Sequence, residues 1–124
     1  STMNDAEQQV RSYLGALGER DFELARTLLA DRGFSYSSPI GNFNDADQFI
    51  QSISAIGPIL EQLSIRRLFA SEDEVMILLD ARITLRGYVT RTSAILFRVG
   101  NGRIVAMEAI FDASEYHKMF DTQD

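Results

Sequence analysis

The chain has 124 residues, which is the size of one domain and enough to bury a hydrophobic core without disulfides. Its net charge is −6, and the only clustered basic residues are Arg66 and Arg67, so we expect no nucleic-acid partner, because phosphate binding needs concentrated positive charge. Cysteine is absent, which excludes disulfides and thiolate chemistry. No segment resembles a signal peptide or a membrane span, so we expect a cytoplasmic chain without membrane association.

Two helices are predicted before residue 34. Asn4 followed by Glu7 is typical of a helix start, and apolar residues then recur at helical spacing as far as Gly18, where glycine favours termination. Asp21 can cap a second, shorter helix, which we expect to end at 31–33.

A short strand with an aromatic face follows these helices. Phe34, Tyr36 and Ser38 alternate, so they share one face of the strand. Pro39 cannot donate to a sheet, and the strand is expected to stop there. A polar side chain at the end of an aromatic face, just before a break, suggests the wall of a cavity.

A third helix is expected after this strand. Asn44 is the expected cap, and Asp45 and Asp47 favour the positive end of the helix dipole, while Gly57 and Pro58 terminate the helix. These carboxylates are explained by the helix start. With one histidine and no cysteine in the chain, we expect no metal site and no cofactor.

The second half of the chain changes to a period of two. Four strands are predicted, at 60–70, 74–86, 88–99 and 103–112, separated by residues with turn chemistry, and 112–120 is expected to add a short terminal helix. Helices followed by an antiparallel meander predict an α+β domain with the helices on one face of the sheet. Strands this long imply strong twist and curl, which leaves a cavity near the wide end of a cone.

One face of the meander is expected to remain uncovered. It combines apolar side chains with Arg82, Arg98 and Glu108, and alternation also places Asp112 on this outer side. An exposed apolar patch with a polar rim is typical of an interface, so we expect an isologous homodimer through the outer sheet face. Its apolar members are Met76, Leu78, Ala94, Leu96 and Ile110.

Five segments resemble one known family in their order and spacing. They are 13–17, 21–30, 36–41, 96–99 and 102–111. Together they resemble the nuclear transport factor 2-like fold, and within it the ketosteroid isomerase-like and SnoaL-like group. The resemblance implies a cone in which a curled antiparallel sheet carries three helices of the N-terminal half on its concave face. It implies a single SnoaL-like domain over residues 1–124, with an ordered core at about 5–120.

The resemblance does not carry the steroid-isomerase chemistry with it. Family members with that activity have a general-base aspartate just before the Pro-x-Gly turn, where this chain has Ser38. They also have a protonated aspartate as an oxyanion donor, and the corresponding position holds Ile95. Only the tyrosine of the first helix is retained, as Tyr13, so the fold gives no warrant for steroid isomerisation.

The weak catalytic candidates are Tyr13 and Ser38. Tyr13 can polarise a carbonyl from the cavity wall or simply fill the core, and Ser38 as a nucleophile needs a base, for which the single histidine is His117. Arg91 shares the parity of the inner face and could select an anion, although we favour a solvated position near the strand end. The predicted ligand-binding residues are Tyr13, Phe34, Tyr36, Ser38, Phe49, Ile83, Ile95, Phe97 and Met107.

Three functions stay open on the sequence alone. The first is an isomerase, cyclase or hydrolase acting on a small apolar substrate, and the second is a non-catalytic protein that binds such a molecule. The third is a dimeric assembly module whose cone is filled by side chains. A carboxylate or histidine facing an open cavity would favour the enzyme, a polar cavity without one would favour binding, and a filled cone would favour assembly.

Overall fold

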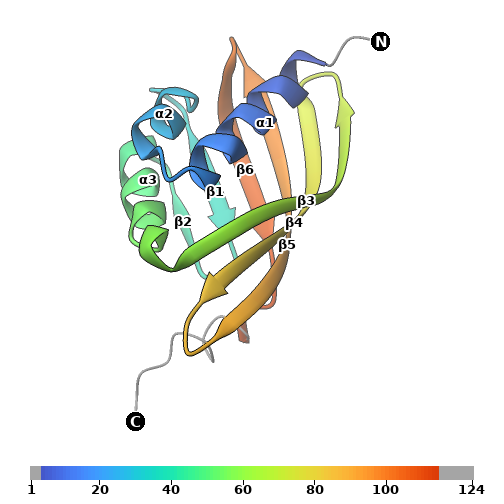
Figure 1. Cartoon of the computed structure of the whole chain (residues 1–124). Helices are drawn as coiled ribbons and strands as arrows, with labels where there is room; N and C mark the ends of the chain where they lie inside the picture. The colour runs from blue at the N-terminus through green and yellow to red at the C-terminus, as the bar shows by residue number, and fades with distance from the viewer. Residues whose placement is uncertain (1–3, 115–124) are drawn as a thin grey trace.

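The computed structural model describes residues 4–114, which form three α-helices, one short 3-10 helix and six strands in a single sheet (Figure 1). In chain order the elements are α1 (Asp5–Gly18), α2 (Phe22–Thr27), β1 (Ser35–Ser38), β2 (Gly41–Phe43), α3 (Ala46–Ser54), η1 (Gly57–Ile59), β3 (Leu60–Ser71), β4 (Glu74–Thr84), β5 (Tyr88–Gly100) and β6 (Arg103–Ile110). The expected terminal helix lies largely outside the described residues, and His117 lies outside them.

The helix starts follow the capping rules. The side chain of Asn4 accepts a hydrogen bond from the backbone N–H of Glu7 at 3.1 Å, and Asp21 caps α2 in the same way, as predicted. The cap of α3 was predicted one residue too early, because Asp45 rather than Asn44 accepts from the N–H of Gln48 at 3.0 Å. The helix therefore begins where a side-chain oxygen reaches its third N–H group.

The sheet is mixed, with the strand order β2-β1-β6-β5-β4-β3. The hairpins of the meander are antiparallel, as predicted, because short turns join them. By contrast, β1 runs parallel to β6, with Ser35 opposite Ala106, so the expectation of a wholly antiparallel sheet was wrong at this edge. A long stretch of chain separates these two strands, so no tight turn fixes their relative direction.

Two strand ends differ from the prediction in ways that matter for the cavity. The chain does not leave the sheet after β1 but reverses at Pro39 and Ile40 into β2, in which Gly41 pairs with Ser38. At the other end, β6 stops at Ile110, two residues before the predicted end. The turn that follows releases Asp112 from the alternation of the strand.

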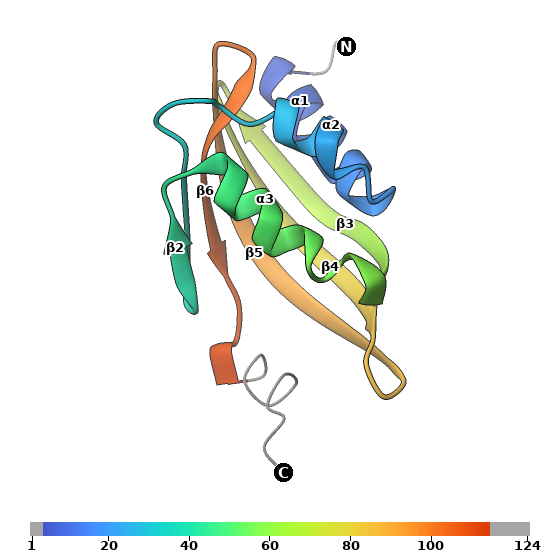
Figure 2. The same cartoon turned by 90° about the vertical axis from the view of Figure 1, so that its left-hand side faces the viewer.

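The three helices cover the concave face of the sheet, as Figure 2 shows. Register shifts in β3 and β6 accompany the curl of the sheet, since such irregularities bend a strand. The core lies between α1 and the sheet, and it includes the fully buried side chains of Val10, Val75, Ile77, Phe97 and Ile104. The predicted α+β cone with helices on its concave face is confirmed.

Candidate functional site

A cavity of about 620 Å³ lies between α3 with η1 and the part of the sheet next to the β4–β5 hairpin. Its walls come from β1, β2, α3, η1, β4, β5 and the residues just after β6. Cavities that hold small organic ligands in proteins have volumes of about 300–1,000 Å³. The size is therefore that of a site for a small molecule.

Tyr36, Phe43 and Phe49 line one wall of the cavity, with Phe34 behind it, and the cluster is centred on Phe49 of α3. Its ring centroid lies 4.5 Å from that of Tyr36, 5.8 Å from that of Phe43 and 5.5 Å from that of Phe34. Phe43 and Tyr36 also lie 6.1 Å apart, so the β1–β2 hairpin and α3 share one aromatic cluster. Such ring pairs add about 0.5–1.5 kcal/mol each beyond the burial of their surface, which stabilises this wall.

Isoleucine side chains extend the apolar lining beyond the aromatic wall. Ile53, Ile56 and Ile59 come from α3, η1 and the turn between them, and Ile83 comes from β4. Ile83 was predicted as a ligand-binding residue, whereas the other three were missed. Their place in the wall depends on how α3 sits over the sheet, which the helical period of the sequence does not encode.

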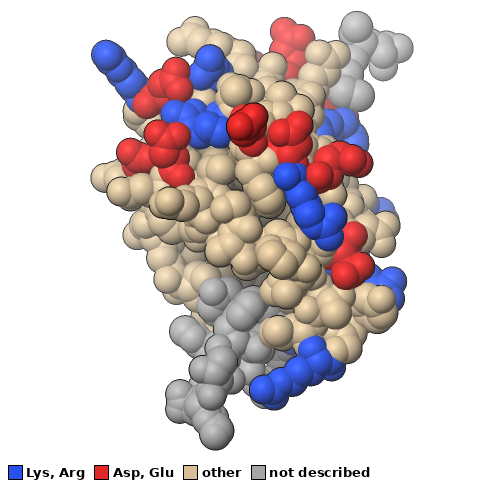
Figure 3. Space-filling view, turned by 60° about the vertical axis from the view of Figure 1, so that its left-hand side comes forward, with Lys and Arg blue, Asp and Glu red and all other residues tan. Residues whose placement is uncertain are grey.

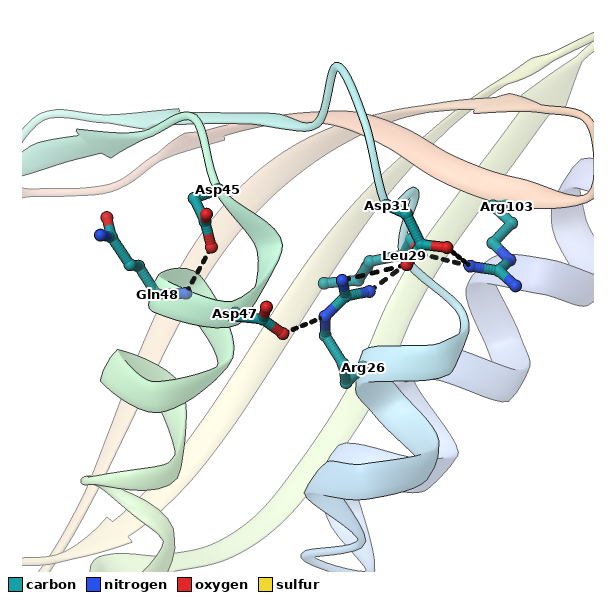
Figure 4. Close-up of polar contacts among 7 residues, drawn as sticks. All are labelled: Arg26, Leu29, Asp31, Asp45, Asp47, Gln48 and Arg103. Atoms are coloured by element: carbon teal, nitrogen blue, oxygen red, sulfur yellow. Dashed lines mark hydrogen bonds and ion pairs between the residues drawn. The ribbon is translucent and has the colours of Figure 1, made fainter.

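Ion pairs connect the N-terminal end of α3 to α2 and link α2 to β6 through Asp31 (Figure 4). Arg26 of α2 contacts Asp47 at the start of α3 at 2.5 Å and Asp31 at 3.0 Å, and Arg103 of β6 contacts Asp31 at 3.2 Å. The hydrogen bond from Arg26 to Asp47, with a smaller contribution from Asp31, raises the pKa of the Arg26 guanidinium. On the face shown in Figure 3, acidic and basic side chains lie across the upper part and along the right-hand side, and the left centre carries few charges.

Ser38 lines the cavity, but its hydroxyl serves the β1–β2 turn. The hydroxyl donates to the carbonyl oxygen of Gly41 at 2.9 Å and accepts from the N–H of Ile40 at 3.3 Å. Both partners belong to the turn, so the structure supplies no base for Ser38 among them. Its expected nucleophilic partner, His117, lies outside the described residues.

Arg91 faces the cavity from β5. It lies opposite Ala81 and on the same face of the strand as Ser93, and both neighbours also line the cavity. Its Nε atom is shielded from solvent. Of the expected solvated position near a strand end, only the strand end was wrong: β5 begins at Tyr88, so Arg91 lies inside the paired part of the strand, and its side chain is still partly exposed.

Asp112 brings a carboxylate to the mouth of the cavity. Its Oδ1 accepts hydrogen bonds from the backbone N–H and the hydroxyl of Ser114, at 3.0 and 2.9 Å. The expected outward position of Asp112 was wrong, because alternation ends with β6 at Ile110. Among the lining residues that the structure describes, Arg91 is the one basic side chain and Asp112 the one acidic side chain.

Tyr13 lies in the core, away from the cavity lining. It is 2% exposed, and its ring meets that of Phe97 edge-on at 6.1 Å. Burial raises the pKa of its hydroxyl, and the neighbouring Tyr36 adds to this effect. The hydroxyl therefore stays protonated throughout the physiological range and has no route to act as a base.

The predicted ligand-binding residues fall into two groups. Tyr36, Ser38, Phe49 and Ile83 are brought together around the cavity. The others belong to the core or pack against it and are not among the lining residues, and they are Tyr13, Phe34, Ile95, Phe97 and Met107. In residues 4–114, no group of three or more His, Cys, Asp or Glu side chains could hold a metal ion. No helix within that range is long and apolar enough to cross a membrane.

No protein-family model and no curated relative matches the chain. Solved structures show that the chain has the nuclear transport factor 2-like fold, in its ketosteroid isomerase-like form. It is similar to an NTF2-like protein of unknown function from Burkholderia pseudomallei, with a TM-score of 0.82, 22% sequence identity and coverage of 97% of this chain and 100% of that one.

Two further solved structures carry functional information about other proteins. An LEH-like epoxide hydrolase from M. tuberculosis superimposes with a TM-score of 0.78, at 20% identity over 92% of this chain and 87% of that one. A protein with a ketosteroid isomerase-like fold from Catenulispora acidiphila, solved in complex with trimethylamine, gives a TM-score of 0.75 at 17% identity over 90% of each chain. At these identities the similarity establishes the fold alone.

Proposed function

We propose that the chain binds a small, largely apolar molecule in the cavity of the cone. The observation that carries the proposal is the open volume of about 620 Å³ beneath α3, which aromatic and isoleucine side chains line together with eight polar or charged residues. Burying the apolar surface of a ligand there releases about 25 cal/mol per Å². The open volume supports binding over the assembly function, which needs a cone filled by side chains.

The fold also supports this proposal. The protein from Catenulispora acidiphila was solved with trimethylamine, so a chain with this fold can hold a small molecule. In the present chain the aromatic cluster around Phe49 and the ion pairs of Arg26 stabilise the wall before any ligand arrives. A wall that is already ordered lowers the entropy cost of binding.

Binding of a neutral fluorescent apolar probe, N-phenyl-naphthylamine, tests the proposal. We expect saturable fluorescence enhancement with the wild-type chain, and a several-fold weaker affinity for Ile53→Trp and Ile56→Trp, because both substitutions fill the cavity from its helical wall. Leu24→Trp is the matched control, since Leu24 is 47% exposed on α2 and is not among the lining residues. Equal affinities for all variants would contradict binding in this cavity.

Catalysis on the bound molecule is a second candidate, favoured by the carboxylate of Asp112 in the lining. A carboxylate at the mouth can accept a proton from water or from the substrate, as isomerases, cyclases and hydrolases require. The fold is shared with an LEH-like epoxide hydrolase, so small apolar epoxides are the first substrates to assay. Turnover that disappears in Asp112→Asn while probe binding persists would support catalysis, and absence of turnover in the wild type would count against it.

We also propose that two copies pair through the outer face of the sheet. Phe69, Met76, Leu78 and Ile110 are 68%, 38%, 37% and 59% exposed, and cross-strand pairing brings them together on this face with the partly buried Ala94 and Leu96. Covering these side chains removes apolar surface from water, which favours association. A second copy offers the same patch, so one two-fold axis can cover both.

A further inference from the structure

Arg91 is unusual among the residues around the cavity because it places a permanent positive charge in a mainly apolar wall. It projects from β5 toward the concave face, opposite the short side chain of Ala81. Its Nε is shielded from solvent, so part of the guanidinium lies within the wall and not in bulk water. A guanidinium removed from water is stabilised most by an anionic oxygen placed against it.

The acidic residue of the described lining is Asp112. Asp112 is exposed, and its Oδ1 already accepts two hydrogen bonds from Ser114. A guanidinium has five N–H donors arranged in a fork, more than one carboxylate can satisfy. Arg91 can therefore bind an anionic oxygen of a ligand whether or not Asp112 contacts it as well.

We propose that the cavity selects apolar molecules that carry a carboxylate, and that Arg91 binds this group. The proposal rests on ligand binding in the cavity and adds the chemical class of the ligand. The aromatic and isoleucine walls take the apolar body, while Arg91, with the hydroxyl of Ser93 on the same face of β5, takes the acid end. The chain as a whole carries a net charge of −6, which repels anions, so the preference for an acid depends on Arg91 itself.

A matched pair of ligands separates this proposal from apolar binding in general. Naphthylacetic acid and its primary amide have nearly the same shape, and each is used to displace the neutral probe from the full chain at neutral pH. We expect the acid to displace the probe at about 10-fold lower concentration or less, the effect of a hydrogen bond to a charged group. Arg91→Gln should abolish this advantage and reverse it, because the remaining charge of Asp112 and of the whole chain repels the acid.

Arg98→Gln is the matched control, since Arg98 lies on the same strand, is exposed and belongs to the outer face. It should keep the preference for the acid. Asp112→Asn, an exposed position, should strengthen binding of the acid several-fold relative to binding of the amide, which provides a test even if Arg91→Gln folds poorly.

The outcomes distinguish the two proposals. If the neutral probe binds but acid and amide displace it equally, or neither displaces it, the carboxylate proposal is overturned while binding in the cavity stands. An acid preference that survives Arg91→Gln, or that is unaffected by Asp112→Asn, also overturns it. If the neutral probe itself does not bind, the proposed function fails and the carboxylate proposal fails with it.

Discussion

Replacing Tyr13 tests whether this residue belongs to the core or to the cavity. Its ring is 2% exposed and packs edge-on against Phe97, and burial raises the pKa of its hydroxyl. Because the folded-state pKa is the higher one, the unfolded chain releases this proton first as the pH rises. The contribution to stability is therefore complete below the unfolded pKa of about 10 and is lost above it, with a slope of about 1.4 kcal/mol per pH unit for one proton.

Tyr13→Phe removes the ionisable group while keeping the ring. Between about pH 10 and 11, the free energy of unfolding of the wild type should therefore fall by about 1 kcal/mol more than that of the variant. Urea unfolding followed by far-ultraviolet circular dichroism measures both, and Tyr88→Phe is the control, because Tyr88 is 64% exposed. We also expect Tyr13→Phe to bind the neutral probe as the wild type does, since Tyr13 does not line the cavity. Identical pH dependence of the two proteins, or a large loss of probe affinity, would refute the core assignment.

Three other outcomes follow from the structure. The wild type should not isomerise 3-oxo-Δ5 steroids above the buffer rate, because Ser38 and Ile95 occupy the positions of the base and of one oxyanion donor. Loss of one such donor alone lowers the rate by about 10²–10³-fold. Clear turnover would contradict this prediction and reveal another base. Arg26→Gln should lower the free energy of unfolding by about 1 kcal/mol at low salt and less at high salt, whereas the exposed Arg32→Gln should not, as urea unfolding would measure. Light scattering should give a mass near twice 13.9 kDa, falling toward 13.9 kDa for Leu78→Arg, and a monomeric wild type would contradict the outer-face dimer.

Helix positions and the meander were predictable because their determinants are local. Asn4 and Asp21 cap helices through hydrogen bonds within one turn, and strand alternation depends on neighbours two residues apart. The direction of β1 was not predictable in this way. It depends on pairing between Ser35 and Ala106, which are far apart in the sequence, and neither residue type favours one direction.

The aromatic part of the candidate site was accessible from the sequence, but its charged part was not. Tyr36 and Ser38 were placed in the wall by alternation before a proline break. Alternation gave the correct face for Arg91 as well, but the uncertain end of the β4–β5 hairpin made a solvated position look more favourable. For Asp112 alternation failed outright, since the strand ends two residues earlier and the chain turns toward the cavity.

The core around Tyr13 and the cavity differ in the chemistry they permit. Tyr13 is buried against Phe97 with Tyr36 as a neighbour, and the position of the family's aspartate donor holds Ile95, which offers no hydrogen bond to a developing oxyanion. The charged side chains of the described lining lie instead around the cavity, where Asp112 is exposed to water. Electrostatic interactions weaken as water approaches, because the effective dielectric constant rises. This arrangement is better suited to recognise a charged group that a ligand already carries than to stabilise charge that forms during a reaction. Binding is therefore the primary function to test.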